Sequence, residues 1–206
     1  MSSKRAKIIS VVGGGFSFRE VDHGLVPGFV IAANDAGLCL QRQVDEIVSM
    51  DRLWTEHRWE ALQGIRTPTH LRRSAVQNVE WESESWAHVF DCDHTSVEFS
   101  DDPNTLNGTS SGTCALNRAY QLRPRKLFLF GFDMCRDING NPYWYAPYPW
   151  TKDTGGTSNG KYNAWAAEFN RIALAFAQIE CEVYNVSRHS KIMCFPRLTP
   201  AQLRVA

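Results

Sequence analysis

Short apolar runs alternate along this chain with segments in which apolar residues recur at helical spacing. Such runs suit strands that are buried on both faces, and most of them stop at Gly, Asn or Asp. The predicted strands span residues 7–12, 29–33, 44–50, 67–72, 87–91, 126–130 and 182–186, and the predicted helices span residues 54–62, 113–122 and 162–179.

Strands that alternate with helices predict an α/β fold, a Rossmann-like parallel sheet with helices on both faces. We expect one nucleotide-binding domain over residues 1–206, with a ligand crevice at the carboxyl ends of the strands. Residues 135–161 are rich in Gly, Pro, Asn and aromatic side chains, which predicts a long lid loop inserted near that crevice.

The first predicted strand leads into Gly13, Gly14 and Gly15. Glycines let a backbone approach phosphate oxygens, and the N-terminus of a following helix offers N–H groups and a positive dipole end. Ser17, with Glu20 three residues later, predicts a capping box for that helix. The run is neither a Walker A motif nor a complete dinucleotide fingerprint, so a tight turn without a ligand is the alternative.

Asn34 and Asp51 follow the second and third predicted strands. Asn34 carries the paired donor and acceptor that can bind a base or a ribose, or it only forms a turn. Asp51 can hold a ribose, coordinate Mg²⁺ or cap the helix that contains Trp54. The sequence leaves these alternatives open.

A second turn, containing Ser110, Ser111 and Gly112, directly precedes the predicted helix 113–122. Its hydroxyl and backbone N–H groups predict an anion-binding cup that faces the glycine turn across the crevice. Two such turns at neighbouring strand ends indicate a phosphate site far more specifically than either turn alone.

Further candidates for chemistry lie at or after the predicted lid. Tyr143 and Tyr145 can donate hydrogen bonds to a leaving phosphate while the loop excludes water, or they form an aromatic cluster under the loop. Asp133, Asp51 and His189 are the candidates for acid–base catalysis, His189 because it follows the last strand.

Composition and charge narrow the class of protein. Hydrophobic residues make up 43% of the chain, charged residues 21%, and the formal net charge is zero, so no overall field attracts nucleic acid or anionic membranes. No apolar run approaches the roughly 20 residues that span a bilayer, and no secretory leader pattern is present. The six scattered Cys predict reduced thiols, and we expect a cytoplasmic protein without a membrane partner.

Blocks of the chain, taken in order, resemble the bacterial sialyltransferases. In that family a Gly/Asn-Gly-Pro-Ser turn and a following Asn hold a cytidine monophosphate sugar, and a lid Tyr contacts the leaving phosphate. The resembling blocks are residues 13–17 with Asn34, residues 109–133, residues 139–143 and residues 183–190. The resemblance implies that the two turns hold the phosphate and ribose, and that Tyr143 or Tyr145 steadies the departing phosphate.

Two departures from that family affect the expected chemistry. Phe16 stands where the family has Pro in the first turn. The family carries a catalytic His just before the long C-terminal helix, where this chain has Ser158 and Asn159, and no His lies between positions 95 and 188. The resemblance therefore supports a nucleotide-binding site in this chain better than it supports sialyl transfer.

The same blocks resemble a wider group that contains archaeal hydroxymethylpterin diphosphokinase and many phage proteins. There an Asp matched by Asp51 serves phosphate and metal binding, which implies Mg²⁺ for this reading. The alternatives to a glycosyltransferase-like enzyme are thus a metal-dependent diphosphotransferase acting on a small heterocycle, or a phage protein that binds a nucleotide without turnover.

The leading hypothesis is an enzyme that transfers a group from a nucleotide-activated donor, with a pyrimidine nucleotide sugar as the expected donor. This reading requires no cofactor. The acceptor stays open among DNA, a glycan and a small molecule, and the sequence is compatible with a homo-oligomer.

Overall fold

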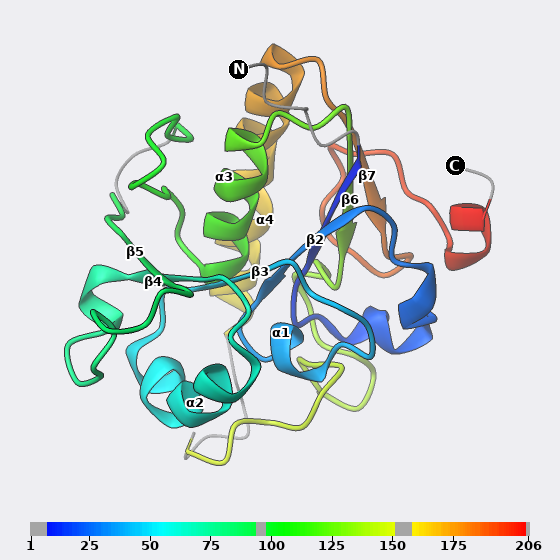
Figure 1. Cartoon of the computed structure of the whole chain (residues 1–206). Coiled ribbons are helices and arrows are strands. Elements are labelled where there is room, and N and C mark those ends of the chain that lie inside the picture. The colour runs from blue at the N-terminus through cyan, green and yellow to red at the C-terminus, as the bar shows by residue number, and fades with distance from the viewer. Residues whose placement is uncertain (1–7, 94–97, 151–157, 205–206) are drawn as a thin grey trace.

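Seven parallel strands in a single sheet form the centre of the molecule (Figure 1). The computed structural model describes residues 8–93, 98–150 and 158–204, so Lys7 of the first predicted strand and residues 151–157 of the predicted loop lie outside the described residues. The strands are β1 (Ile8–Val12), β2 (Phe29–Ala33), β3 (Glu46–Ser49), β4 (Thr69–Arg72), β5 (Ala87–Phe90), β6 (Lys126–Phe130) and β7 (Glu182–Val186).

The sheet order is β5-β4-β3-β2-β1-β6-β7. The chain therefore builds the sheet in one direction from β1 to β5, and then returns to the other side of β1 with β6. This reversal makes β1 and β6 the topological switch point, where a parallel α/β sheet opens a crevice at its strand ends. Their paired ends are Val12 and Phe130.

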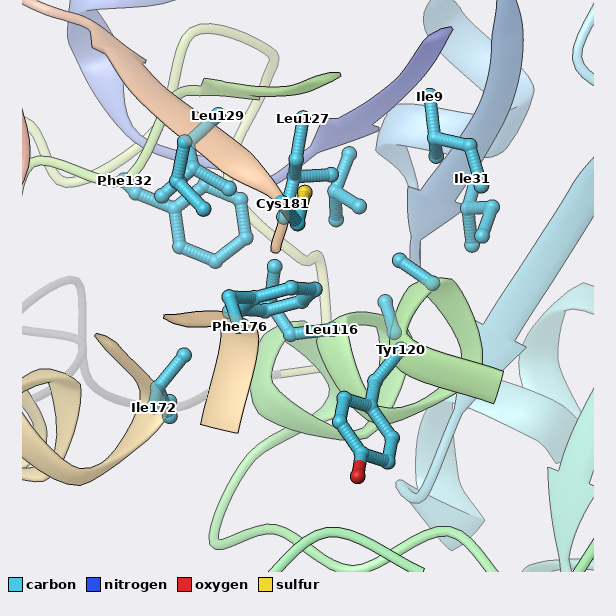
Figure 2. Close-up of a cluster of buried hydrophobic side chains, with 14 of the residues drawn as sticks. Ile9, Ile31, Leu116, Tyr120, Leu127, Leu129, Phe132, Ile172, Phe176 and Cys181 are labelled. Carbon is cyan, nitrogen blue, oxygen red and sulfur yellow. The ribbon is translucent and has the colours of Figure 1, made fainter. Parts of the chain in front are cut away.

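Helices cover both faces of the sheet, as predicted (Figure 1). On one face α3 and α4 pack over strand residues such as Ile9 and Leu127, and their own residues Leu116 and Phe176 complete this core (Figure 2). The opposite face is covered by α1 and α2, with Trp54 fully buried there. The helices are α1 (Ala36–Cys39), α2 (Arg52–Ile65), α3 (Ser111–Gln121) and α4 (Asn159–Gln178).

The three longer helices begin at side-chain caps. Asp51 accepts a hydrogen bond from the Trp54 N–H at the start of α2, and Ser158 accepts one from Lys161 at the start of α4. Ser110 and Thr113 form a reciprocal capping box at the start of α3. Each cap satisfies a backbone donor that the first helical turn leaves without a partner.

The predicted capping role of Ser17 is wrong. The segment after the glycines is a 3₁₀ helix, Phe16–Glu20, whose N-cap is Gly15 and makes no side-chain cap bond. Ser17 lies inside this helix because its hydroxyl and N–H both bind Asp133, a partner 116 positions away in the sequence. The Ser17 hydroxyl thus binds the distant Asp133 carboxylate in place of the local cap bond that the sequence predicted.

Within the described residues, no helix combines the length and the apolar character that crossing a membrane requires.

Candidate functional site

The glycine turn and the end of β6 are joined backbone to backbone at the switch point. The Gly13 N–H donates to the Phe130 carbonyl and the Gly15 N–H to the Gly131 carbonyl, both at 2.8 Å. A Cβ on Gly13 would lie 2.8 Å from the Gly131 oxygen, and one on Gly15 would lie 2.5 Å from it. Side chains at Gly13 and Gly15 are therefore excluded by the packing of two strand ends, whether or not a ligand is bound.

A cavity of ≈ 400 Å³ opens beside this junction, at the carboxyl ends of the strands. It brings together most of the predicted site residues, including both turns, Asn34, Asp51, Asp133, Tyr143 and Tyr145. Ser17 and His189 are not among its lining residues. The turn formed by residues 13–15 (the glycine turn) and the turn formed by residues 110–112 (the serine turn) therefore line the same cavity, as the sequence predicted.

The serine turn presents the start of α3 to the cavity. Ser110 is the N-cap, so the N–H groups of Ser111 and Gly112 come first in the helix, where no helical carbonyl lies behind them. The Ser111 hydroxyl accepts the Met50 N–H at 3.1 Å, which fixes the turn against the end of β3. A phosphate bound here would meet N–H donors and the positive end of the helix dipole.

The first turns of α4 form a further wall of the cavity that the sequence analysis did not identify. Lys161, Tyr162 and Trp165 line it, and the Lys161 ammonium lies 5.0 Å from the Trp165 ring centre. Lys161 is the basic side chain among the described lining residues. Its place at the end of the predicted loop 135–161, which is rich in Gly and aromatic residues, was the available sequence signal.

The part of the predicted lid that the structure describes before α4, residues 135–150, is docked on the glycine turn, whereas residues 159–161 of the predicted loop belong to α4. The Trp144 N–H donates to the Gly14 carbonyl at 3.1 Å, and its indole N–H donates to the Gly13 carbonyl at 3.0 Å. Gly15 and Tyr143 form an antiparallel bridge. The lid is thus held to the same turn that we expected to hold phosphate.

Aromatic rings of this segment pack closely against one another. The rings of Tyr143 and Tyr145 stack at 5.3 Å, and the Tyr145 and Tyr148 hydroxyls lie 3.2 Å apart. Burial raises the pKa of all three phenols above the ordinary value, so they stay protonated and act as hydrogen-bond donors. Trp150 extends the cluster by stacking on Tyr148 and on His57. The aromatic cluster and a phosphate-binding role are compatible, because the same tyrosines line the cavity.

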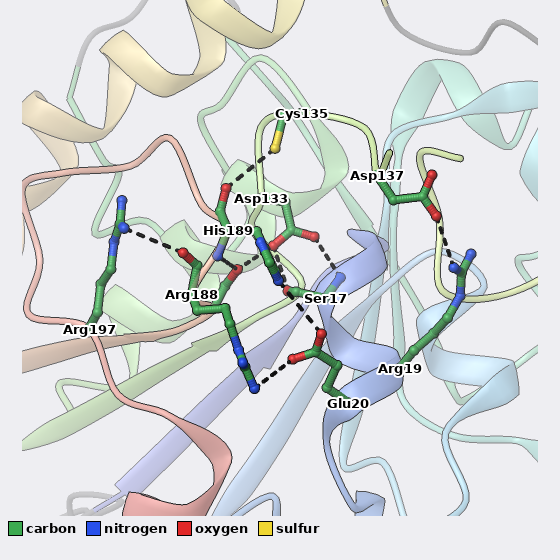
Figure 3. A network of polar contacts seen from close by, with 10 residues as sticks. Ser17, Arg19, Glu20, Asp133, Cys135, Asp137, Arg188, His189 and Arg197 are labelled. Atoms are coloured by element: carbon green, nitrogen blue, oxygen red, sulfur yellow. Dashed lines mark hydrogen bonds and ion pairs between the residues drawn. The ribbon is translucent and has the colours of Figure 1, made fainter. Parts of the chain in front are cut away.

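The carboxylate of Asp133 is buried and connects three segments (Figure 3). It accepts hydrogen bonds from the Ser17 N–H at 2.8 Å, the Ser17 hydroxyl at 2.5 Å and the Ser187 hydroxyl at 2.5 Å. These bonds tie the end of β6 to the 3₁₀ helix and to the end of β7. Asp133 therefore has a structural role at the switch point, and its acid–base role stays a prediction.

His189 is not among the residues that line the cavity, and its side chain lies beside Glu20 in the polar network (Figure 3). Its Nε2 is 3.6 Å from an oxygen of Glu20, and its ring centre is 5.6 Å from that of Phe16. Its role as a general base stays a prediction.

Asp51 and Asn34 both line the cavity. Asp51 is exposed, and its Oδ1 accepts the Trp54 N–H at 3.1 Å, so the capping alternative is confirmed without excluding a second role. Asn34 adopts a left-handed φ of 54°, and its side chain interacts with that of Tyr148, but its buried Oδ1 has no hydrogen-bond partner among the described residues. A buried acceptor without a donor is costly unless a ligand supplies one.

Metal binding draws little support from the described part of the chain. There, no group of three or more His, Cys, Asp or Glu side chains could hold a metal ion. Asp51 is the exposed carboxylate at the cavity, and one such ligand, aided by phosphate oxygens, fits only the weak Mg²⁺ coordination of a nucleotide complex. The dependence on Mg²⁺ stays a prediction.

Comparison with solved structures identifies glycosyltransferases of the same fold. The sialyltransferase CstII from Campylobacter jejuni with CMP-3FNeuAc has a TM-score of 0.56 and 14% identity, covering 94% of this chain and 86% of that one. CstII with a trisaccharide acceptor and CMP has a TM-score of 0.58, 14% identity and the same coverage. The MAf glycosyltransferase from Magnetospirillum magneticum AMB-1 has a TM-score of 0.55 and 16% identity over 98% of this chain.

This chain spans 35% of the length of the MAf glycosyltransferase. No protein-family model and no curated protein matches the sequence. At these identities the likeness shows a shared Rossmann-like fold, and the resemblance to the sialyltransferases noted from the motifs agrees with it.

Proposed function

We propose that this protein is a glycosyltransferase-like enzyme that transfers a group from a nucleotide-activated donor, with a pyrimidine nucleotide sugar as the donor. The observation that carries the proposal is that Gly14 and Ser111 line one cavity at the switch point of the sheet. The solved structures of the same fold support it, since CstII is recorded with CMP and with a CMP-sugar analogue.

The described residues suggest how such a donor would be held. The N–H groups of Ser111 and Gly112 and the Lys161 ammonium would offset the phosphate charge. Protonated Tyr143 would donate to the phosphate as negative charge develops on it during departure of the sugar. Asn34, with its unpaired Oδ1, would accept a hydrogen bond from the base or the ribose.

Asp51 is the best candidate for activating the acceptor hydroxyl. It is exposed to the cavity, whereas the Asp133 carboxylate already accepts three hydrogen bonds and would lose them by taking a proton. A base must reach the proton that it removes, and His189 does not line the cavity.

The test is release of nucleotide from CMP-, UDP- and GDP-sugars, followed by chromatography with glycan, DNA or small hydroxylic acceptors, with and without EDTA. We expect release from a pyrimidine donor in EDTA, and a loss of roughly 10²-fold or more in Asp51→Asn. The matched control is Asp101→Asn, a carboxylate on the surface beside Arg123, which should keep full activity.

Two outcomes would replace the proposal. Activity that EDTA abolishes, with a diphosphate as the transferred group, would favour the metal-dependent diphosphotransferase. Tight binding with no donor consumed would favour a nucleotide-binding protein without turnover. The latter has one specific observation behind it, since no His is found among the described residues that line the cavity.

A further inference from the structure

Two cysteines lie together beside the serine turn, outside the cavity lining. Cys92 follows β5 and is half-buried, whereas Cys114 lies in the first turn of α3 and is fully buried. The Cys92 sulfur lies 3.5 Å and the Cys114 sulfur 4.0 Å from the same Gly108 carbonyl oxygen. Residues distant in the sequence thus bring two thiols to one backbone group.

The two thiols also interact with each other, with opposite consequences. A hydrogen bond from the Cys114 side chain, helped by the nearby charge of Arg72, lowers the pKa of Cys92 below its ordinary value. The same contact and burial raise the pKa of Cys114. The thiolate is the reactive form of cysteine, so the half-buried Cys92 is the thiol that attacks first. The buried Cys114 is the second thiol, which resolves the mixed disulfide.

We propose that Cys92 and Cys114 form an oxidant-reactive thiol pair that closes a disulfide with a low-molecular-weight disulfide such as oxidised glutathione. The Cys92 thiolate attacks one glutathione sulfur, forming a mixed disulfide and releasing one glutathione thiolate. Cys114 then loses its proton and attacks the Cys92 sulfur, releasing the second glutathione. The protein loses two protons and two electrons, and the oxidant is reduced to two glutathione molecules.

The pair is coupled to the serine turn through Gly108. A Cβ on Gly108 would lie 2.6 Å from the Thr113 hydroxyl and 2.8 Å from the Cys114 N–H, so this residue packs tightly against the start of α3. Closing the disulfide removes the two S–H groups that can donate to the Gly108 carbonyl. The turn that leads into Ser110 would shift, and this effect on nucleotide binding rests on the proposed function.

The chemistry is tested by treating the full-length protein with oxidised glutathione, quenching with acid and mapping peptides without reduction. We expect a cross-link between Cys92 and Cys114. Cys92→Ser should give neither the cross-link nor an adduct on Cys114, and Cys114→Ala should hold a stable glutathione adduct on Cys92. Cys39→Ser, which removes an exposed cysteine, is the control and should cross-link like the wild type.

A second measurement covers the event that Cys114→Ala fails to fold. At pH 7, iodoacetamide should modify Cys92 of the wild type about tenfold faster than Cys39, because more of Cys92 is thiolate. Equal rates, or a mixed disulfide on wild-type Cys92 that never resolves, would overturn the thiol pair.

The coupling is measured separately, as the affinity for CMP before and after oxidation. We expect the affinity to fall about fivefold or more in the cross-linked form and to recover with dithiothreitol. A cross-linked protein with unchanged affinity would overturn the coupling, whereas a cross-link in a protein that binds no nucleotide in either form would count against the proposed function instead.

Discussion

The phenol oxygen of Tyr145 occupies the place that a side chain on Gly14 would need. A Cβ built on Gly14 would lie 2.6 Å from that oxygen and 3.1 Å from the ring of Tyr143. The predicted lid and the glycine turn therefore pack tightly, and Gly14 must lack a side chain where the Tyr145 hydroxyl lies. The absence of a side chain at Gly14 then serves lid docking as well as any approach of phosphate.

Gly14→Ala should displace Tyr145 and loosen the lid. We expect the affinity for CMP to fall about tenfold and the free energy of unfolding to fall by about 1–3 kcal/mol, the usual cost of an added methyl group in a packed site. Gly64→Ala in α2 is the control, because no atom of the described residues lies within 4 Å of its Cβ position. That variant should be about 0.5–1 kcal/mol more stable and bind normally. If Gly14→Ala bound CMP with wild-type affinity, the packing of the lid on Gly14 would not contribute to nucleotide binding.

Asp133→Asn should act mainly on stability. The substitution puts an amide N–H₂ among three donors from Ser17 and Ser187, so buried hydrogen bonds are lost. We expect a loss of about 2–4 kcal/mol in urea unfolding, whereas Asp101→Asn on the surface should lose less than about 1 kcal/mol. A fully stable Asp133→Asn without activity would instead make Asp133 a catalytic residue.

Ser110→Ala should fray the start of α3 and with it the proposed phosphate cup. The hydroxyl accepts the Thr113 N–H, and removing such a cap costs about 1 kcal/mol. Ser158→Ala removes the matching cap of α4 and should cost a similar amount in thermal unfolding. Amide hydrogen exchange at Thr113, whose N–H the Ser110 hydroxyl accepts, should accelerate only in Ser110→Ala. Unchanged exchange there would show that the turn is held without its cap.

Glu46 makes stability depend on acidity in the region of pH 2 to 5. Burial alone would raise its pKa, but hydrogen bonds from Arg118, together with the nearby His70 ring, lower the pKa to about 2 from an ordinary value of 4.5; the His70 Nε2 lies 3.2 Å from a Glu46 oxygen. Because the folded pKa is depressed, the stabilisation is present above pH 4.5 and is lost as the pH falls toward 2.

Glu46→Gln should therefore cost up to about 3 kcal/mol in urea unfolding at pH 7, and about half of that difference should disappear between pH 5 and pH 3. Glu60→Gln, on an exposed part of α2, is the control and should show no such change. A penalty for Glu46→Gln that stays constant down to pH 3 would contradict the ion-pair network.

The strands were the most predictable part of the fold. The prediction for β6, Lys126–Phe130, has the observed bounds because Pro124 precedes an apolar run and Gly131, with a φ of 65°, ends it. By contrast α1, Ala36–Cys39, is too short to show any helical period and was not predicted. Single-turn elements depend on tertiary contacts that a local pattern does not contain.

The site was predictable where it depends on strand ends. Gly14 and Ser111 could be placed together because parallel strands end at one edge of the sheet. The partnership of Ser17 with Asp133 could not, since a capping pattern and a distant carboxylate compete for the same hydroxyl. The position of Lys161 in the cavity wall could not be predicted either, because it depends on how α4 packs beside the cavity.

The most direct measurement is calorimetric titration of CMP into the wild type, Ser111→Ala and Ser83→Ala. Ser111 lines the cavity, and Ser83 lines a separate surface groove beside α2. We expect one CMP per chain, a dissociation constant raised about tenfold by Ser111→Ala, the equivalent of roughly 1.4 kcal/mol, and no change with Ser83→Ala. Binding that is equally strong in folded Ser111→Ala, or no binding of any nucleotide to the wild type, would contradict a phosphate site between the two turns.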